Sequence, residues 1–295
     1  RTQATSSHPP QPVMAAPALN ESSLARRVGL EEVDAAGEGR PDLVLMIAAT
    51  MNGWKLPILM EELGERYDYV FIDFASGMQK SPEFKRFNPN GRIPALYDRS
   101  NGLRLAESGA LLEYVAEKYH SRRPAVYPSE VHQRWSIKQW VYWQVSGLGP
   151  AMGQAMYMQR LALPQGLDVS QFVVQRFLAE SQRCLLVIAE QVAASGGPFL
   201  FGSEPTIADI AAYPYARSHF WANLDVGGEE LSPLRAWLDA CDARPSFREG
   251  LRIPHERREF FGEGDWQAMI STNARGFQLS ADGKQSGADE SRKES

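Results

Sequence analysis

Two short stretches of the sequence combine residue types that could bind a peptide-like ligand. In the first, Pro94 follows Ile93 at the start of a short apolar run, and proline is poorly placed inside a sheet because it has no N–H to donate. A trans proline would make this an ordinary edge strand, whereas a cis bond would leave the Ile93 backbone free to pair with an extended ligand. In the second, Glu107 and Ser108 precede a helical pattern, so Ser108 is expected to be the helix N-cap.

Composition and charge argue against several other kinds of chemistry. The 295 residues carry 31 Lys and Arg against 36 Asp and Glu, a formal net charge of −5 with no basic stripe, so no nucleic-acid partner is expected. No apolar run reaches about 18 residues, so no membrane span is expected. The two cysteines, Cys184 and Cys241, form no CxxC pair and no cluster with histidine, which predicts no metal site and a cytoplasmic, reducing location.

The first stretch belongs to a segment with the pattern of a small α/β domain. Four runs have strand character: 43–48, 69–73, 93–97 and 103–106. Between the first two, a helix is expected to begin near Trp54 and to end at Gly64, and Ser81 is expected to cap a short helix that begins at Pro82. The order β-α-β followed by β-β-α predicts a four-stranded mixed sheet in a domain that ends near His120.

The rest of the chain has helical periodicity, which sets the domain boundaries. Helical patterns cover 129–160, 168–194, 206–221 and 231–243. The run from Gly147 to Pro150 should kink or break the first of them, and Thr206 with Asp209 has the form of a capping box. The predicted domains are a disordered extension (1–40), an α/β domain (41–120), a linker (121–128), an all-helical domain (129–265) and a disordered tail (266–295).

Three motifs in this order resemble those of the cytosolic glutathione transferases. They are NPNGRIPAL (88–96), ESGALLEYVAEKY (107–119) and TIADI (206–210). The runs MNGWK (51–55) and QWVYWQVSGLGPAMGQAMY (139–157) are similar to one branch of that family, the fungal transferases related to the prion-forming nitrogen regulator and the bacterial nu-class transferases. The resemblance covers about 42–250 and implies a thioredoxin-like α/β N-terminal domain followed by an all-α C-terminal domain.

The family binds the tripeptide glutathione, γ-Glu-Cys-Gly, as a co-substrate, and the resemblance implies where its parts would bind. Ser108 at a helix start would hold the α-carboxylate, and Glu107 would hold the α-ammonium. A plain capped helix is the alternative interpretation of this pair. Ile93, before a cis Pro94, would pair with the cysteinyl backbone through its own N–H and C=O.

The glycyl end of the ligand is expected near two further polar residues. Gln79 lies in the loop before Ser81, where relatives place a polar side chain near the glycyl carboxylate, and Arg92 could add charge near the same ligand. A solvated loop residue and a surface arginine are the alternatives for these two positions.

The loop that ends at Asn52 is the expected site of chemistry, because it precedes a helix whose positive dipole end favours a thiolate. The Asn52 amide can donate a hydrogen bond to the sulfur but cannot accept its proton, so Asn52 is expected to stabilise the thiolate, with Thr50 as a second donor. A ligand-free helix cap is the alternative for Asn52. Lys55 could strengthen the local field or point to solvent. No cysteine lies in this loop, so a mixed disulfide with a protein thiol is not expected.

The resemblance leaves three functions open. The first is a glutathione S-transferase that conjugates a bulky apolar electrophile, in detoxification or in fungal secondary metabolism, with a pocket lined by the aromatic first helix of the helical domain and by residues near Tyr157, Phe220 and Trp221. The second is a glutathione-dependent disulfide or peroxide reductase, and the third is a non-enzymatic regulatory protein that binds glutathione. The family also implies a homodimer, with that first helix at the interface.

Overall fold

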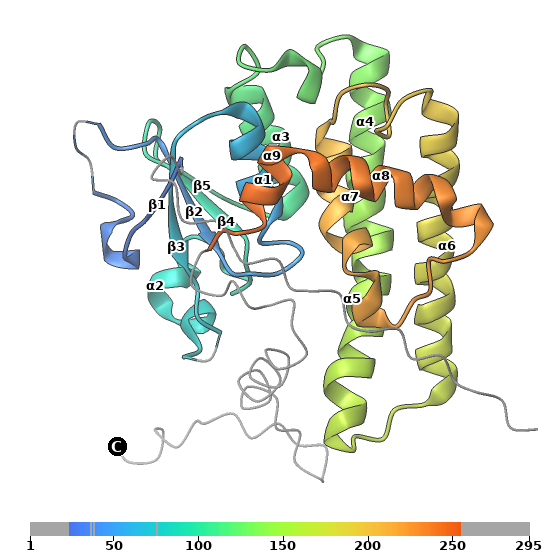
Figure 1. Ribbon diagram of the computed structural model, residues 1–295. Coiled ribbons are helices and arrows are strands. Elements are labelled where there is room, and N and C mark those ends of the chain that lie inside the picture. The colour runs from blue at the N-terminus through green and yellow to red at the C-terminus, as the bar shows by residue number, and fades with distance from the viewer. Residues whose placement is uncertain (1–23, 36, 38, 75, 255–295) are drawn as a thin grey trace, which may run out of the picture.

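The protein is described by a computed structural model that places residues 24–254, apart from 36, 38 and 75. An α/β domain lies beside a helical domain (Figure 1). The predicted tail (266–295) and residues 1–23 of the predicted extension lie outside the described residues. The described part of that extension contains the strand β1 (Ala25–Arg27) and a 3-10 turn (Leu30–Glu32), so the expected disorder is wrong for this part.

One mixed sheet of five strands forms the centre of the α/β domain. Its strands are β1 (Ala25–Arg27), β2 (Leu43–Ile47), β3 (Tyr67–Phe71), β4 (Ala95–Asp98) and β5 (Leu103–Ala106), in the spatial order β1-β3-β2-β4-β5. Strand β3 is parallel to β1 and β2, whereas β4 is antiparallel to β2 and β5. The prediction of a mixed sheet is confirmed, but the predicted count of four strands is wrong because β1 joins its edge, and β3 begins two residues before the predicted strand.

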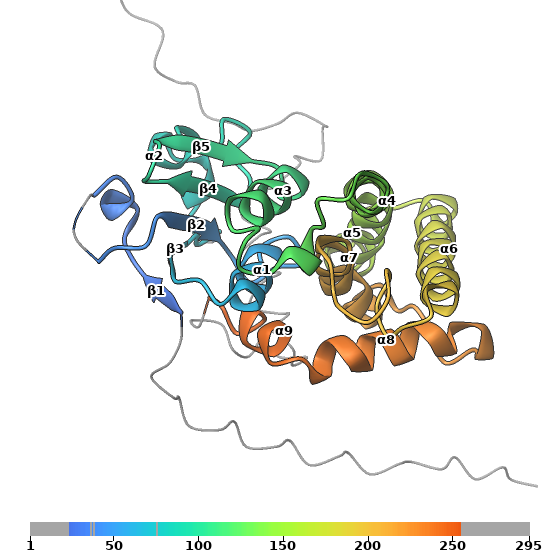
Figure 2. The same ribbon diagram turned by 90° about the horizontal axis from the view of Figure 1, so that it is seen from above.

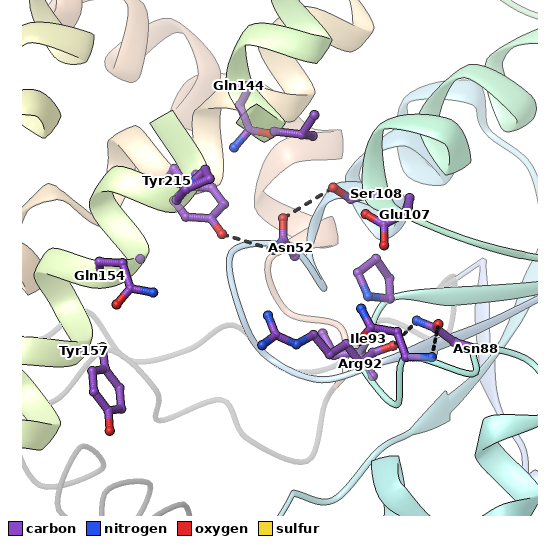
Figure 3. A pocket seen from close by; sticks show the side chains of 16 residues that line it. Asn52, Asn88, Arg92, Ile93, Glu107, Ser108, Gln144, Gln154, Tyr157 and Tyr215 are labelled. Carbon is purple, nitrogen blue, oxygen red and sulfur yellow. Dashed lines mark hydrogen bonds between the residues drawn. The ribbon is translucent and has the colours of Figure 1, made fainter. Parts of the chain in front are cut away.

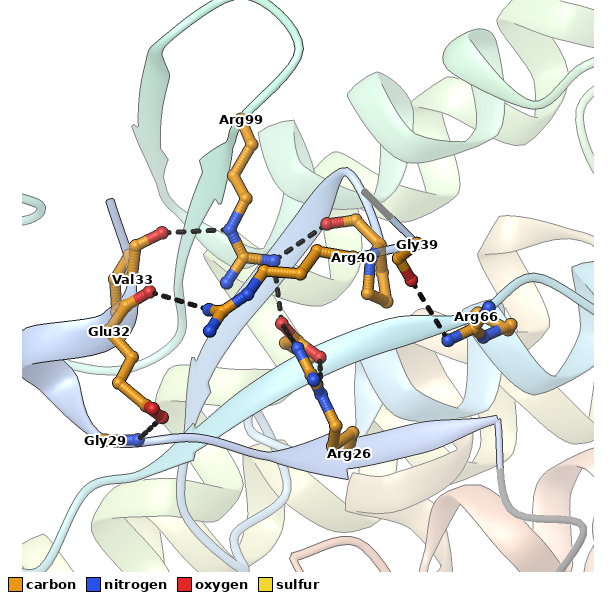
Figure 4. A network of polar contacts seen from close by, with 10 residues as sticks. Arg26, Gly29, Glu32, Val33, Gly39, Arg40, Arg66 and Arg99 are labelled. Atoms are coloured by element: carbon orange, nitrogen blue, oxygen red, sulfur yellow. Dashed lines mark hydrogen bonds and ion pairs between the residues drawn. The ribbon is translucent and has the colours of Figure 1, made fainter. Parts of the chain in front are cut away.

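The added strand pairs with β3 through its backbone and also carries an ion pair to the sheet (Figure 4). Arg26 donates two hydrogen bonds of 2.8 Å to the carboxylate of Asp68, and Arg99 donates a third of 2.7 Å. Burial would raise the pKa of the Asp68 carboxyl, but the hydrogen bonds from Arg26 and Arg99 hold this pKa below its ordinary value. A three-residue strand of this kind has no period-two apolar pattern, which is why the sequence did not indicate it.

Helices pack on both faces of the sheet. They are α1 (Lys55–Leu63) and α3 (Ser108–Lys118), which lie between the sheet and the helical domain (Figure 2), and the short α2 (Pro82–Lys85). The side chains of β2 alternate accordingly: Leu43 and Leu45 enter the large core that α1 and α3 share with the helical domain, whereas Val44 enters a smaller core with Phe84 of α2.

Three helix ends agree with the local sequence signals. Helix α1 ends at Gly64 in the left-handed conformation, with φ of 70°. Ser81 caps α2 by accepting a hydrogen bond from the amide of Phe84 at 3.2 Å. Thr206 and Asp209 form the predicted capping box, in which Asp209 accepts the Thr206 amide at 2.8 Å. These predictions are confirmed.

The helical domain is built around one long, continuous helical run. This run comprises α4 (Val131–Trp143), a π-helix (Gln144–Leu148), α5 (Gly149–Tyr157) and a second π-helix (Met158–Ala162), and it is followed by α6 (Gln171–Ser195), α7 (Ile207–Arg217), α8 (Ser232–Ala243) and α9 (Pro245–Gly250). Further 3-10 turns lie at Met78–Lys80, Pro124–Val126, Leu163–Gln165, His219–Ala222 and Glu229–Leu231. The first π-helix occupies the place of the predicted kink, because a wider turn accommodates Gly147 and Pro150 without ending the helix.

Helix α9 fixes the helical domain against α1. A Cβ atom on Gly250 would lie 2.5 Å from the backbone of Ile58, so this approach requires glycine. Arg244, at the start of α9, donates two hydrogen bonds of 2.8 and 2.7 Å to the buried carboxylate of Glu62. The first turn of α1 also meets the first π-helix across the domain boundary, where the Lys55 ammonium donates to the Gln144 amide oxygen, and α7 packs against both α1 and α3. Within the placed part of the chain, no helix combines the length and apolarity needed to cross a bilayer.

Candidate functional site

A pocket of about 520 Å³ lies between the α/β domain and the helical domain (Figure 3). Six of the predicted site residues line it: Asn52, Arg92, Ile93, Pro94, Glu107 and Ser108. The helical domain contributes Gln144, Gln154, Tyr157 and Tyr215 to the opposite wall. The structure thus brings together residues that are far apart in the sequence, whereas the predicted residues Thr50 and Gln79 are not part of the lining.

The start of α3 presents an acidic side chain and a hydroxyl to the pocket. Ser108 is the first residue of the helix, and Glu107 takes the N-cap position that the sequence assigned to Ser108. Glu107 has φ of 71°, a conformation that costs a non-glycine residue about 1–3 kcal/mol and that is concentrated at functional sites. The first turn of α3 also exposes the positive end of the helix dipole. An amino acid with its carboxylate near Ser108 and its ammonium near Glu107 would match this arrangement.

The loop before β4 presents unpaired backbone to the same pocket. The Ile93–Pro94 bond is cis, which decides between the two interpretations left open by the sequence. Strand pairing begins only at Ala95, and among the described residues the Ile93 backbone makes no hydrogen bond. Asn88 fixes this loop, since its side chain donates to the carbonyl of Arg92 at 2.7 Å. The sequence analysis assigned Asn88 no role beyond its place in the NPNGRIPAL motif, so its positioning role was missed.

Asn52 lies at the junction of the two domains. Its amide nitrogen donates to the Tyr215 hydroxyl at 3.0 Å, and its amide oxygen accepts from the Ser108 hydroxyl at 3.4 Å. Thr50 supports the loop from outside the pocket, where its hydroxyl accepts the amide of Gly53 at 3.1 Å. A Cβ atom on Gly53 would lie 1.9 Å from the Ala48 carbonyl oxygen, so the tight turn that presents Asn52 requires glycine.

Lys55 is a feature of the site that the sequence did not settle. Its side chain is fully buried, and its ammonium donates to the Ser108 hydroxyl at 3.1 Å and to the Gln144 amide oxygen at 2.5 Å. The ammonium also lies 5.5 Å from the centre of the Tyr215 ring. Burial lowers the pKa of Lys55 to about 7. The side chain therefore points inward, and the partners that hold it could not be read from the local sequence.

Tyr215 is a second polar group that the sequence did not single out. It projects from α7 toward Asn52 (Figure 3), and burial raises the pKa of its phenol to about 12. Since the phenol oxygen accepts a hydrogen bond from Asn52, its own hydrogen is available to donate elsewhere. Tyr215 is thus a neutral hydrogen-bond donor at neutral pH.

The two residues predicted at the glycyl end differ in their placement. Arg92 lines the pocket and is exposed. Gln79 lies outside the lining, beside the 88–92 loop: a Cβ atom on Gly91 would come within 2.9 Å of its carbonyl oxygen. The side-chain oxygen of Gln79 is buried, with no hydrogen-bond partner among the placed residues. The ligand roles of both residues stay predictions.

The helical wall of the pocket is more polar than expected. Of the aromatic residues predicted near the acceptor, Tyr157 lines the pocket, whereas Trp221 is buried in the core and Phe220 is exposed outside the lining. Trp135 and Tyr142 of α4 are 61% and 50% exposed and lie outside the lining. The sequence did not show which face of this long helix would turn toward the pocket. On that face Gln144, Gln154 and Tyr157 alternate with Val145, Pro150 and two glycines.

Neither cysteine has the environment of a reactive thiol. Cys184 and Cys241 are buried and unpaired, and burial raises the pKa of Cys184 to about 11. Cys184 is therefore a core residue of α6. In the described ranges, no group of three or more His, Cys, Asp or Glu residues has the arrangement of a metal site.

Comparisons with known proteins agree with this architecture. Residues 44–117 match the model of the glutathione S-transferase N-terminal domain, and residues 171–240 match that of the C-terminal domain. The disulfide-bond oxidoreductase YfcG of Escherichia coli is 33% identical over 70% of this chain and 93% of its own length. The transcriptional regulator URE2 of Saccharomyces cerevisiae is 32% identical over 68% of this chain and 65% of its own length.

A solved structure shares the same arrangement of domains. The glutathione transferase BgramDRAFT_1843 of Burkholderia graminis, crystallised with two glutathione molecules bound to each subunit, is 31% identical. Its alignment covers 77% of this chain and 94% of that protein, with a TM-score of 0.66. Together with the two matched domains, these similarities show that this chain belongs to the glutathione S-transferase family.

Proposed function

We propose that the protein binds glutathione in the pocket between its domains and stabilises the thiolate with Asn52 for attack on an electrophile. One observation carries the proposal: Asn52, Ser108 and the unpaired backbone of Ile93 meet in a single pocket. An extended tripeptide with its α-carboxylate at Ser108 and its cysteinyl backbone at Ile93 would direct its sulfur toward Asn52. Family membership and the glutathione bound to the Burkholderia graminis protein support the choice of ligand.

The ends of the ligand are assigned by charge. The Ser108 hydroxyl and the first turn of α3 receive the α-carboxylate, and Glu107 receives the α-ammonium. The exposed guanidinium of Arg92 faces the glycyl carboxylate. Gln79 has no direct ligand contact in this proposal, because it lies outside the lining.

The sulfur is activated by donors rather than by a base. The Asn52 amide exchanges its bond to the Tyr215 phenol for one to the sulfur, and the phenol donates a second bond. Neither group can accept the thiol proton, since an amide nitrogen has no basic lone pair and the phenol is already protonated. The proton therefore leaves to solvent, and the sulfur attacks as a stabilised thiolate. Thr50 acts indirectly, by holding the loop through Gly53.

Calorimetric titration with glutathione, followed by conjugation assays, tests this proposal. The wild type should bind glutathione, and the Ser108→Ala variant should bind it at least tenfold more weakly, because the carboxylate loses a charge-assisted hydrogen bond of about 1.5–3 kcal/mol. The Ser203→Ala variant, altered at an exposed serine, serves as the matched control and should bind like the wild type. Absence of glutathione binding by the wild type would contradict the proposal.

A second candidate function is reduction of disulfides, with glutathione supplying both thiols. Gln154 and Tyr157 on the helical wall favour it, because their amide and phenol groups can form hydrogen bonds to a second peptide and offer nothing comparable to an apolar acceptor. The name of YfcG and the two glutathione molecules in the Burkholderia graminis protein point the same way. Turnover of 2-hydroxyethyl disulfide that exceeds conjugation of every electrophile in a panel, with two glutathione molecules bound per chain, would establish this function instead.

The remaining proposals concern a regulatory role, the biological context, the location and the oligomeric state. The similarity to URE2 keeps a regulatory role open, and glutathione binding without turnover of electrophiles or disulfides would favour it. Detoxification and secondary metabolism stay proposals for the conjugating enzyme. The buried free cysteines suit the proposed cytoplasmic location.

We also propose a homodimer through the exposed face of α4, where Val131 and Trp135 are 63% and 61% exposed. Sedimentation of the wild type and of the Trp135→Glu variant tests this proposal.

A further inference from the structure

Lys55 is a fully buried cation, and no carboxylate of the placed residues pairs with it. Its two hydrogen-bond acceptors, the Ser108 hydroxyl and the Gln144 amide oxygen, are both neutral. A buried charge without a counter-charge is unfavourable, and burial accordingly lowers the pKa of Lys55 to about 7. In the protein without ligand, Lys55 is therefore only partly protonated at neutral pH.

The groups around Lys55 do not supply the missing negative charge. The Tyr215 ring of α7 lies 5.5 Å away, and its phenol, with a pKa of about 12, is neutral. Glu107 at the start of α3 and Arg92 in the 88–92 loop line the same pocket, but neither shares a hydrogen bond or ion pair with Lys55. The π-helix contributes the neutral side chain of Gln144.

The other charges on α1 lie two turns away and have partners of their own. Glu61 accepts a hydrogen bond from Tyr67 at 3.1 Å, and Glu62 pairs with Arg244 of α9 at 2.7 Å. Burial raises the pKa of Glu61, and the charge of Glu249, in α9, repels that of Glu61 at this same end of α1 and helps to raise this pKa. The first turn of α1 thus carries an isolated positive charge.

A second buried group in the same cluster lacks a hydrogen-bond acceptor, as Lys55 lacks a counter-charge. The side-chain nitrogen of Gln144 is buried and donates to no acceptor among the described residues, while the oxygen of that amide is taken up by Lys55. A lone buried cation and a lone buried donor both favour an anion nearby, since an anion can compensate each of them.

The hydroxyl of Ser108 connects this cluster to the pocket. Because Lys55 donates to its oxygen, the hydroxyl hydrogen must point elsewhere, and in the structure it points to the Asn52 amide oxygen across a long 3.4 Å. A carboxylate in the pocket is a stronger acceptor for this hydrogen than that distant amide. Such a carboxylate would lie one hydroxyl group away from the ammonium of Lys55.

We propose that Lys55 is the counter-charge for the α-carboxylate of the bound γ-glutamyl ligand, so that ligand binding and protonation of Lys55 are coupled. This inference rests on the proposed function. The proton comes from solvent, and Lys55 does not touch the ligand: it is a positioning residue that orients the Ser108 hydroxyl and supplies charge behind it. Well below pH 7 the lysine is already charged and binding takes up no proton, whereas between the pKa of Lys55 in the free protein and its pKa in the complex binding takes up as much as one proton.

Calorimetry with S-methylglutathione isolates this effect, because its thioether cannot ionise. Binding to the full chain is measured between pH 7 and 8 in buffers of different ionisation enthalpy, which gives the number of protons taken up. The wild type should take up a substantial fraction of one proton. The Lys55→Met variant should take up none and bind about tenfold or more weakly. The 4-aminobutyryl analogue of the ligand, which lacks only the α-carboxylate, should bind to the wild type without this uptake.

A direct readout on the wild type keeps the inference falsifiable if Lys55→Met does not fold. The side-chain carbon and nitrogen resonances of Lys55, followed against pH by nuclear magnetic resonance, should titrate at a higher pH once S-methylglutathione is bound. An unchanged titration, or equal proton uptake by wild type and Lys55→Met, would overturn this inference alone. Failure of the wild type to bind S-methylglutathione would overturn the proposed function and this inference with it.

Discussion

Replacement of Asn52 by alanine should slow conjugation at low pH and leave it nearly unchanged at high pH. In the structure the Asn52 amide donates to the neutral phenol of Tyr215 at 3.0 Å, and in the proposed complex it donates to a charged sulfur instead. A neutral hydrogen bond contributes about 0.5–1.5 kcal/mol and one to a charged group about 1.5–3 kcal/mol, so the exchange favours the thiolate by about 1–1.5 kcal/mol. Since one pH unit corresponds to about 1.4 kcal/mol, the alanine variant should raise the pKa of the bound thiol by about one unit.

The assay is the pH dependence of kcat with an electrophile at saturating glutathione. Well below the thiol pKa, the variant should be about tenfold slower, because the thiolate fraction falls by that factor. Above both pKa values the two rates should converge. The Asn101→Ala variant is a matched control, since Asn101 lies in the β4–β5 hairpin outside the pocket lining, and its profile should follow the wild type. A loss by the same factor at every pH would refute the reasoning, since it would mean that Asn52 does not act on thiol ionisation.

Three further variants test other parts of the account. Tyr215→Phe removes a neutral donor and the partner of Asn52, so it should lower kcat by about 2- to 10-fold at neutral pH without loss of glutathione binding. Gly250→Ala forces a Cβ atom to within 2.5 Å of the Ile58 backbone and should lower the free energy of unfolding by about 1–3 kcal/mol in chemical denaturation, whereas Gly153→Ala, in open space on α5, should not. The lowered pKa of Asp68 means that its ion pairs stabilise the fold above about pH 4 and lose this effect as the pH falls through the lowered value, so Asp68→Asn should show a weaker pH dependence of melting temperature below pH 4.

The features that the sequence predicted well are those set by neighbouring residues. The end of α1 at Gly64, the cap at Ser81 and the capping box of Thr206 each depend on backbone and side-chain groups only a few positions apart. The same is true of the loop at Ile93, where the proline that follows already made a cis peptide bond one of two alternatives. Shifts of one or two residues, as at the start of α3, are the ordinary limit of such signals.

The features that the sequence missed depend on contacts between distant segments. The partners of Lys55 lie 53 and 89 residues away, and the Asn52–Tyr215 hydrogen bond spans 163 residues. A lysine in the first turn of a helix carries no local sign that it will be buried. Strand β1 was missed for a related reason, because it depends on pairing with β3 and on an ion pair from Arg26 to Asp68, 42 residues away.

The pKa of the glutathione thiol in its complex with the protein tests the central claim most directly. It can be measured from the ultraviolet absorbance of the thiolate as the pH is raised, on wild type and on Asn52→Ala. An ordinary cysteine thiol has a pKa of about 8.5. The account predicts that the bound thiol ionises at least one pH unit below free glutathione in the wild type, and that most of this difference is lost in Asn52→Ala. A bound thiol that titrates like free glutathione would contradict the account.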